Sequence, residues 1–508
     1  MEILNRIKKF RMALFCGLLL ALSFPNFLYP ELFWGFDLLA FFSLLPLFMD
    51  IGRDRPGLAF KKGYVAGLLF FLLSLYWILH VKPMGPGALP AWIGLSAYLA
   101  LYPALFFGGV AWGLKRSWPF QALWIPALWT VLEALREILL TGFPWVSLGS
   151  SQTSNLSLLP LVSVTGVYGL HFAVVLGNIL AWKLLRPLEW KRREWFGAVL
   201  AIALLIGLRF QAPARPQGAP TVKVAVLQGN IDQDHDWTAD YRRELMTNYF
   251  AMMTEAADAG AKVLIWPESS FPGIFGRGDP EEVRLLEFAR SRHLALIFGA
   301  TLEAPGERNF SNAAVFIDSS GNVSTYAKRH LVPFGETIPF RARLPVLDQM
   351  LRRIGLADFK EGPGPVAFES EGFRLSPLVC YESIYGEAAR ESGIGALAII
   401  TLDTWFGNSP APRYHMGHAI LRAVESGRWV ARAAATGVSC FVSPEGRVLA
   451  RQPLNTRGWI MQEMDCASSQ TPYQRYGAWF VGLCALLLVL AVITGKTLIS
   501  KGETPELN

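Results

Sequence analysis

The chain has 508 residues, of which 52% are hydrophobic and only 17% are charged, and its mean hydropathy is +0.32. This composition is too apolar for an ordinary soluble protein of this size, so it indicates a membrane protein. The formal net charge of +7 raises the question of nucleic-acid binding, which the distribution of charge along the chain can answer.

Apolar runs of about 20 residues, the length that crosses a bilayer, occur seven times before residue 212 and once near the C-terminus. Between them lies a segment of ordinary globular composition. The eight predicted membrane spans are 12–30, 34–50, 63–81, 89–114, 118–140, 160–182, 195–211 and 477–495.

Basic residues gather in alternate connecting segments. Four lie in the first eleven residues and four more in the 51–62 loop, whereas the 82–88 and 141–159 loops carry only Lys82. By the positive-inside rule, both termini are cytoplasmic and the globular segment is on the opposite side. The predicted cytoplasmic pieces hold 17 basic and seven acidic residues. Their surplus exceeds the charge of the whole chain, so we expect no binding to nucleic acid.

These boundaries predict a membrane domain of seven spans over residues 1–211 and a Pro-rich linker over 212–220. A globular domain over 221–466 follows, and the eighth span with a cytoplasmic tail occupies 467–508. Charged side chains inside a span are normally paired. We therefore expect Glu133 and Arg136 in the fifth span to form an ion pair, with substrate contact as the alternative.

The globular segment alternates β-rich runs with helical patterns. Strands are predicted within 222–230, 262–270, 294–301, 313–331, 373–383, 397–405 and 429–450, and helices over 240–258, 281–293 and 414–426. Continuous apolar strands separated by helices are typical of an α/β sheet covered by helices. The 313–331 run contains Ser-Ser-Gly-Asn and is predicted to be a hairpin.

Three polar residues stand where predicted strands end or turn: Glu268 after VLIWP, Lys328 in the second arm of the hairpin, and Cys380 after SPLV. Strand ends of α/β sheets are where reactive groups gather. A carboxylate can accept a thiol proton, a thiolate can attack a carbonyl carbon, and an ammonium can stabilise the resulting oxyanion. Each residue taken alone is more often structural, as a turn carboxylate, a surface lysine or a buried thiol.

The sequences around these residues, WPESSFP, YAKRHLVPFGE and LVCYES, resemble in order and spacing the Glu-Lys-Cys triad of the nitrilase superfamily. Together with the membrane spans, LTGFPWVSLGSSQ (140–152), TGVYGL (165–170) and LQGNIDQDHDW (227–237), they resemble one family, the bacterial apolipoprotein N-acyltransferases. The resemblance covers nearly the whole chain.

The resemblance implies a polytopic α-helical membrane domain and an α/β nitrilase-like (αββα sandwich) domain in the periplasm, both carried by the bacterial inner membrane. It implies transfer of a fatty acyl chain from a phospholipid to the α-amino group of the S-diacylglyceryl-cysteine of apolipoproteins, the last step of lipoprotein maturation. Glu268 would be the general base, Cys380 the nucleophile that forms a thioester, and Lys328 the stabiliser of the oxyanion. No cofactor or metal is expected, and we expect a monomer whose partners are phospholipid, apolipoprotein and bilayer.

Further family positions associated with activity match Trp237, Glu336, Tyr381 and Glu382. Glu336 and Glu382 are at least as suited to orienting Lys328 or its loop as to direct chemistry. Trp237 and Tyr381 could equally be packing or interfacial aromatics. Segments suited to an interfacial lid are 272–278, 342–359 and 405–414, with ordinary surface loops as the alternative.

The chain departs from the family at two places. The family commonly has Asn-Asp before the WFG motif, where this chain has Leu402 and Asp403, and a Thr-Asn-Thr-Gly run is replaced by Ala434, Ala435, Thr436 and Gly437. Apolar side chains cannot donate the hydrogen bonds of an amide, so details of acceptor binding stay open.

Two questions about other residue types also arise. The pairing state of Cys440 and Cys466 is open, because the segment that contains them is predicted on the oxidising side of the membrane. His415 and His418 are spaced for one helix face, but the neighbouring sequence offers no third metal ligand.

Two alternatives remain for the function. The first is a membrane-tethered amidase or nitrilase-type hydrolase with the same triad, which would release its acyl group to water. The second is a catalytically inert lipid-binding scaffold, in which Cys380 would never become acylated.

Overall fold

The computed structural model describes ten stretches of the chain: 2–25, 35–52, 54–116, 118–186, 191–213, 220–231, 238–303, 310–339, 359–467 and 470–500. They form two compact units. The helical unit comprises Met1–Ala212, Phe406–Tyr414 and Thr471–Asn508, and the α/β unit comprises Pro213–Trp405 and His415–Gln470. The predicted linker falls largely on residues 214–219, which lie outside the described residues.

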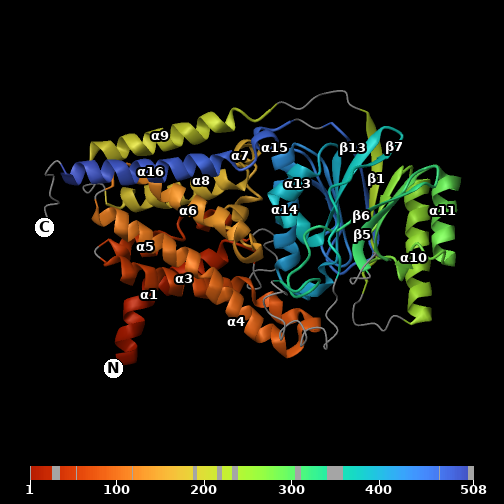
Figure 1. Ribbon diagram of the computed structural model, residues 1–508, viewed down its shortest axis with the longest axis horizontal. Helices are drawn as coiled ribbons and strands as arrows, with labels where there is room; N and C mark the ends of the chain where they lie inside the picture. Colours follow the sequence, from red (N-terminus) through yellow and green to blue (C-terminus); the bar gives the residue numbers. More distant parts are fainter. Residues whose placement is uncertain are drawn as a thin grey trace. The chain divides into compact units, whose positions relative to one another are not determined.

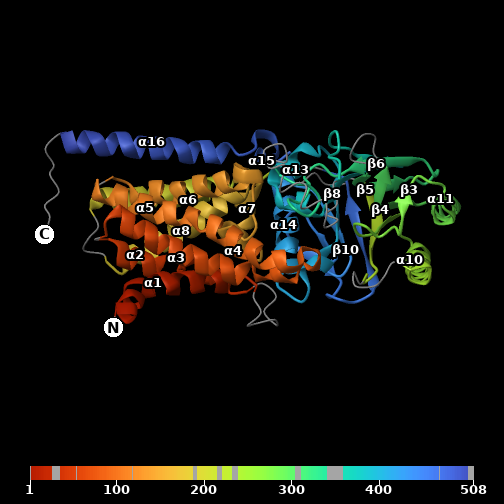
Figure 2. The same cartoon turned by 60° about the horizontal axis from the view of Figure 1, so that its bottom comes forward.

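Long helices run side by side in the helical unit (Figures 1 and 2). Helix α3 packs against α1 and α5, and α6 packs against α8. Gly63 of α3 permits the close approach to α5, because a Cβ there would lie 2.6 Å from the carbonyl oxygen of Pro103. The helices are α1 (Glu2–Leu22), α2 (Leu45–Ile51), α3 (Pro56–Ser74), α4 (Ala88–Leu99), α5 (Leu101–Lys115), α6 (Gln121–Ile138), α7 (Leu159–Thr165), α8 (Val167–Leu184), α9 (Arg192–Arg209), α15 (Pro472–Tyr476) and α16 (Trp479–Ser500).

Three helical stretches among the described residues are long and apolar enough to cross a membrane, namely Pro56–His80, Met84–Lys115 and Val167–Leu184. Trp479–Gly495 is apolar but shorter. The predicted run 160–182 is divided between α7 and α8 at Gly166, which has a φ of +67° and sits against the ring of Tyr473. The predicted run 34–50 contains a 3₁₀ turn and the seven-residue helix α2, rather than one continuous helix.

Large apolar side chains are exposed along α9 and α16, among them Phe196, Val199, Val489 and Ile493. Such a concentration would be unusual on a surface in water and is typical of a surface in lipid. The predicted ion pair is confirmed: Arg136 Nε donates to Glu133 Oε2 over 2.9 Å. The same guanidinium donates to the carbonyl oxygens of Phe143 and Trp145, so its role is to hold the chain after α6.

The α/β unit contains two sheets. The first has the order β13-β1-β2-β4-β5-β6, with β3 also paired to β4, and the second has the order β12-β11-β10-β9-β8-β7. The strands of the first are β1 (Thr221–Gln228), β2 (Val263–Ile265), β3 (Ile274–Phe275), β4 (Ala295–Glu303), β5 (Phe310–Ile317), β6 (Val323–Ala327) and β13 (Gly458–Asp465). Those of the second are β7 (Phe368–Ser370), β8 (Phe373–Val379), β9 (Ala396–Thr401), β10 (Val430–Ala434), β11 (Cys440–Val442) and β12 (Val448–Arg451).

The two sheets share one apolar core, to which Val226 and Ile297 of the first sheet and Val379 and Ile400 of the second contribute. A second core lies between the first sheet and two helices, α10 (Ala239–Asp258) and α11 (Pro280–Arg292). The helices α13 (Gly386–Glu391) and α14 (Ala411–Ser426) lie on the side of the second sheet (Figure 1). The order of layers is therefore helix, sheet, sheet, helix, as the family resemblance implies.

Strand direction determines where the polar residues meet. Strands β1, β2 and β4 are parallel, and so are β8, β9 and β10. Strand β6 runs in the direction of β4, because both pair antiparallel with β5. The predicted hairpin is confirmed, but β6 ends at Ala327, so Lys328 lies just beyond the strand rather than in it. Strand β13, which pairs along the whole length of β1, was not predicted from the sequence.

Candidate active site

The predicted triad residues each follow the end of a strand: Glu268 follows β2, Lys328 follows β6 and Cys380 follows β8. The first two form an ion pair, with Lys328 Nζ 3.3 Å from Glu268 Oε1. Both side chains are almost completely buried. Gly299 of β4 allows this packing, because a Cβ there would lie 2.4 Å from the Cα of Glu268.

A second carboxylate contacts the same ammonium. Glu336 Oε1 lies 2.9 Å from Lys328 Nζ, and its Oε2 accepts a hydrogen bond from the backbone N–H of Val332. Burial would lower the pKa of Lys328, but Glu268 and Glu336 raise it above its usual range. The lysine is therefore a permanent cation, and Glu336 orients it.

Asn312 of β5 joins the two carboxylates, and the sequence analysis missed it. Its Nδ2 donates to Glu268 Oε1 and to Glu336 Oε1, both over 2.7 Å, and its backbone oxygen accepts from the N–H of Lys328. The feature of the sequence that could have pointed to Asn312 is its amide side chain near the start of an otherwise apolar strand. Asn312 thus fixes the separation of two like charges.

The nucleophile candidate, Cys380, has a φ of +49°, which is unusual for a residue other than glycine. Burial and the charge of Glu268 raise the pKa of its thiol, while Lys328 and a hydrogen bond with the Thr401 hydroxyl lower it. The balance leaves the pKa above its usual range. The resting group is therefore a thiol, and a base must remove its proton before it can attack.

Glu382 ties the thiol segment to the lysine segment. Its Oε2 accepts from the backbone N–H of Val379 over 2.7 Å, and its Oε1 accepts from the Tyr326 hydroxyl and from the N–H groups of Arg329 and His330. The side chain is fully buried. These contacts agree with the orienting role weighed for it in the sequence analysis.

Two family models match the chain. The apolipoprotein N-acyltransferase N-terminal domain matches residues 16–180, and the carbon-nitrogen hydrolase model matches residues 223–472. An apolipoprotein N-acyltransferase from Geobacter metallireducens is 35% identical over 497 residues, covering 94% of this chain and 93% of the relative. The chain belongs to the apolipoprotein N-acyltransferase family.

Another member of the family, from Azotobacter vinelandii, is 34% identical over 94% of this chain and 95% of its own length. Among solved structures, an amidase from Nesterenkonia sp. is similar at 20% identity, with a TM-score of 0.38, over 53% of this chain and 97% of the amidase. The chain is thus a membrane-bound acyltransferase of the family, and its α/β unit has the carbon-nitrogen hydrolase fold.

The other family positions have distinct surroundings. Tyr381 is buried, and its hydroxyl accepts a hydrogen bond from the Tyr385 hydroxyl over 3.0 Å. Burial raises the pKa of Tyr381 to about 12, so it is a neutral phenol. Trp237 lies outside the described residues.

Of the candidate lid segments, 272–278 is held by Glu282, which accepts from the N–H groups of Gly276 and Gly278. Nearly all of 342–359 lies outside the described residues. Residues Phe406–Tyr414 belong to the helical unit, where Phe406 packs edge-on against Trp77 and the Tyr414 hydroxyl donates to the carbonyl of Pro25.

At the positions that depart from the family sequence, backbone N–H groups make the hydrogen bonds. The backbone N–H of Leu402 donates to Glu268 Oε2 over 2.8 Å, and that of Ala435 donates to the carbonyl of Thr401. The N–H of Ala434 donates to the Ser439 hydroxyl. These hydrogen bonds do not depend on the side chains at the three positions.

Cys440 and Cys466 are both free thiols. Cys440 is fully buried, and burial raises its pKa to about 11, whereas Cys466 accepts a hydrogen bond from the N–H of Arg374. No cluster of three metal-ligating side chains occurs within the described stretches. His415 instead lies 2.9 Å from Asp403, a partner that the sequence analysis missed.

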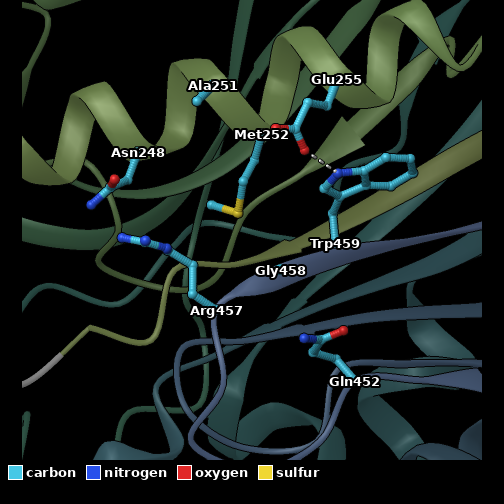
Figure 3. Close-up of a pocket in the computed structure, with 8 residues that line it drawn as sticks. All are labelled: Asn248, Ala251, Met252, Glu255, Gln452, Arg457, Gly458 and Trp459. Carbon is cyan, nitrogen blue, oxygen red and sulfur yellow. Dashed lines mark hydrogen bonds between the residues drawn. The ribbon is translucent and has the colours of Figure 1, made fainter.

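A surface pocket of about 480 Å³ lies between α10 and β13 (Figure 3). In it, Trp459 Nε1 donates to Glu255 over 3.0 Å, and the side chain of Arg457 extends toward Asn248. None of the three triad residues lines this pocket.

Proposed function

We propose that this protein transfers a fatty acyl chain from a membrane phospholipid to the α-amino group of the S-diacylglyceryl-cysteine at the N-terminus of apolipoproteins. The reaction proceeds through a thioester on Cys380. The observation that carries this proposal is the cluster of Glu268, Lys328 and Cys380 at the ends of three strands, in a chain that belongs to this family.

In the first half-reaction, Glu268 takes the thiol proton as the sulfur attacks the ester carbonyl carbon of the phospholipid. Hydrogen bonds to Glu268 and Glu336 use two of the three N–H groups of Lys328, so a third can face the developing oxyanion. The C–O bond then breaks, the leaving oxygen takes the proton from Glu268, and lysophospholipid departs.

In the second half-reaction, the amine of the apolipoprotein attacks the thioester carbonyl carbon. Glu268 accepts the proton that the amine loses, the C–S bond breaks, and the proton returns to the sulfur of Cys380. Donor and acceptor thus use one site in turn, and ping-pong kinetics follow. Water must be excluded between the two halves, because it would convert the transferase into a hydrolase.

Eight spans, both termini in the cytoplasm and the α/β unit in the periplasm form the proposed topology in the bacterial inner membrane. The alternation of basic loops supports this orientation. We propose that residues 1–211 and 467–508 belong to the membrane part, that 212–220 link it to the catalytic domain at 221–466, and that one copy of the chain is sufficient for activity.

The test is intact-mass spectrometry of the purified full-length protein with phosphatidylethanolamine vesicles, with and without a diacylated lipopeptide. A fatty-acyl adduct on Cys380 should form and then disappear as the lipopeptide gains an amide-linked chain. Loss of the adduct to water alone would support the hydrolase. Absence of any adduct would remove Cys380 from the mechanism, and Cys380→Ser is the matched control.

A further inference from the structure

A buried ionic cluster adjoins the nucleophile segment and has no part in the triad chemistry. Asp403 follows β9, His415 lies on α14 and Arg432 lies on β10, and all three side chains are completely buried. Asp403 Oδ1 is 2.9 Å from His415 Nδ1, and Asp403 Oδ2 accepts from Arg432 Nη2 over 2.7 Å. Burial alone would raise the pKa of Asp403, but Arg432 and His415 hold it well below its usual range.

The other ring nitrogen of His415 faces the main chain of the nucleophile. His415 Nε2 lies 3.1 Å from the carbonyl oxygen of Cys380 and 2.8 Å from the Ser383 hydroxyl. That hydroxyl donates its single proton to the same carbonyl oxygen over 2.8 Å. Since a carbonyl oxygen only accepts, the 3.1 Å contact requires a proton on Nε2.

The first ring nitrogen has an acceptor and a donor beside it. Asp403 Oδ1 lies 2.9 Å from His415 Nδ1, and Arg432 Nη2, which can only donate, lies 3.2 Å from the same nitrogen. These two contacts fix the orientation of the ring, so that Nε2 faces the Cys380 carbonyl.

We propose that His415 is a positioning residue for the nucleophile: it donates from Nε2 to the Cys380 carbonyl and holds Cys380 in its left-handed backbone conformation. This inference rests on the proposed role of Cys380. A left-handed conformation at a non-glycine residue costs free energy unless its surroundings hold it, and the bond from His415 supplies such a constraint.

The charged groups that bear on this proposal are few. Asp403 and Arg432 contact the ring itself. The Cys380 thiol interacts electrostatically with Glu268, Lys328 and Asp403, and the buried Cys440 thiol interacts with Arg432 and Asp403. Of these described groups, His415 is the one whose side chain reaches the Cys380 carbonyl.

Two substitutions test the hydrogen bond. His415→Asn is too short to reach the Cys380 carbonyl, whereas His415→Gln keeps an N–H donor near the position of Nε2. His418→Gln is the matched control, because His418 lies on the same helix and is also buried. The measurements are the single-turnover rate of Cys380 acylation by phosphatidylethanolamine and the temperature of thermal unfolding.

We expect His415→Asn to slow acylation by about 30-fold and His415→Gln to react at least about threefold faster than His415→Asn. His418→Gln should leave the acylation rate unchanged. A merely structural role for His415 would lower the unfolding temperature of both variants without any recovery of the rate by glutamine.

The outcomes are distinguishable. If the wild-type protein forms no adduct on Cys380, the proposed function fails. If it does, and His415→Asn acylates at the wild-type rate or His415→Gln is as slow as His415→Asn, only the positioning role is overturned. Should the variants not fold, ¹⁵N-histidine NMR of the wild-type protein decides the matter: Nε2 of His415 should carry a proton, and a ring with its proton on Nδ1 alone would contradict the proposal.

Discussion

The Glu382 carboxylate accepts a 2.7 Å hydrogen bond from the backbone N–H of Val379, the residue immediately before Cys380. Its other oxygen binds the N–H groups of Arg329 and His330, which immediately follow Lys328. One buried side chain thus sets the position of the thiol relative to the ammonium, although it contacts neither group in these hydrogen bonds.

Replacing Glu382 with Gln should impair both stability and acyl transfer. The amide nitrogen cannot accept, so at least one buried N–H loses its partner, at a cost of about 1–3 kcal/mol. The acylation rate should fall about 100-fold, because the thiol of Cys380 and the ammonium of Lys328 are no longer held at a fixed distance from each other. Thermal unfolding and intact-mass kinetics measure the two effects. Glu387→Gln, at an exposed ion pair on α13, is the control, and equal behaviour of the two variants would contradict this account.

A negative charge at position 312 should slow Cys380 acylation more than removal of the side chain does. Asn312→Ala removes the donor that separates Glu268 from Glu336, whereas Asn312→Asp adds a third carboxylate beside them. We expect Asn312→Asp to slow Cys380 acylation at least about tenfold more than Asn312→Ala. Asn248→Asp, on α10, controls for the change in charge. An aspartate variant as active as the alanine variant would show that the separation of charges is unimportant.

Alkylation of Cys380 by iodoacetamide should respond with opposite signs to two substitutions. Burial and Glu268 raise the pKa of the thiol and Lys328 lowers it, so Glu268→Gln should increase the thiolate fraction and Lys328→Met should decrease it. At about pH 8, near the usual pKa of a thiol, the first variant should react faster than wild type and the second more slowly. Both should lose acyl transfer by about 100-fold or more. If both variants were alkylated faster than the wild type, or both more slowly, the effects assigned to Glu268 and Lys328 on the thiol would be wrong.

Gly437 is the position where a single methyl group should disturb the buried ionic cluster. A Cβ there would lie 2.0 Å from Asp403 Oδ2, the oxygen that binds Arg432. Gly437→Ala should therefore destabilise the protein by about 1–3 kcal/mol through overpacking. Gly364→Ala provides the control, because no neighbouring atom lies within 4 Å of its Cβ position. Differential scanning fluorimetry of the two variants should show a lower transition temperature for Gly437→Ala alone.

The parts of this protein that follow a local pattern could be predicted from sequence. Helices α10 and α11 and the hairpin of β5 and β6 have clear periodicity or turn residues, and Glu268 and Cys380 come shortly after apolar strands. The pairing of β13 with β1 joins segments more than 200 residues apart, for which no local pattern exists. The contacts of Asn312 with Glu268 and of Asp403 with His415 were missed for the same reason, since the partners come from other segments of the chain.

The hydrogen bond from the Leu402 backbone N–H to Glu268 has a consequence for how this site can evolve. Every amino acid except proline supplies that donor, so Glu268, the proposed general base, places little demand on the side chain at position 402. Leu402 instead belongs to the apolar core between the first sheet and its helices. A lineage can therefore exchange an amide for a leucine there through changes in packing alone, while the carboxylate keeps its orientation.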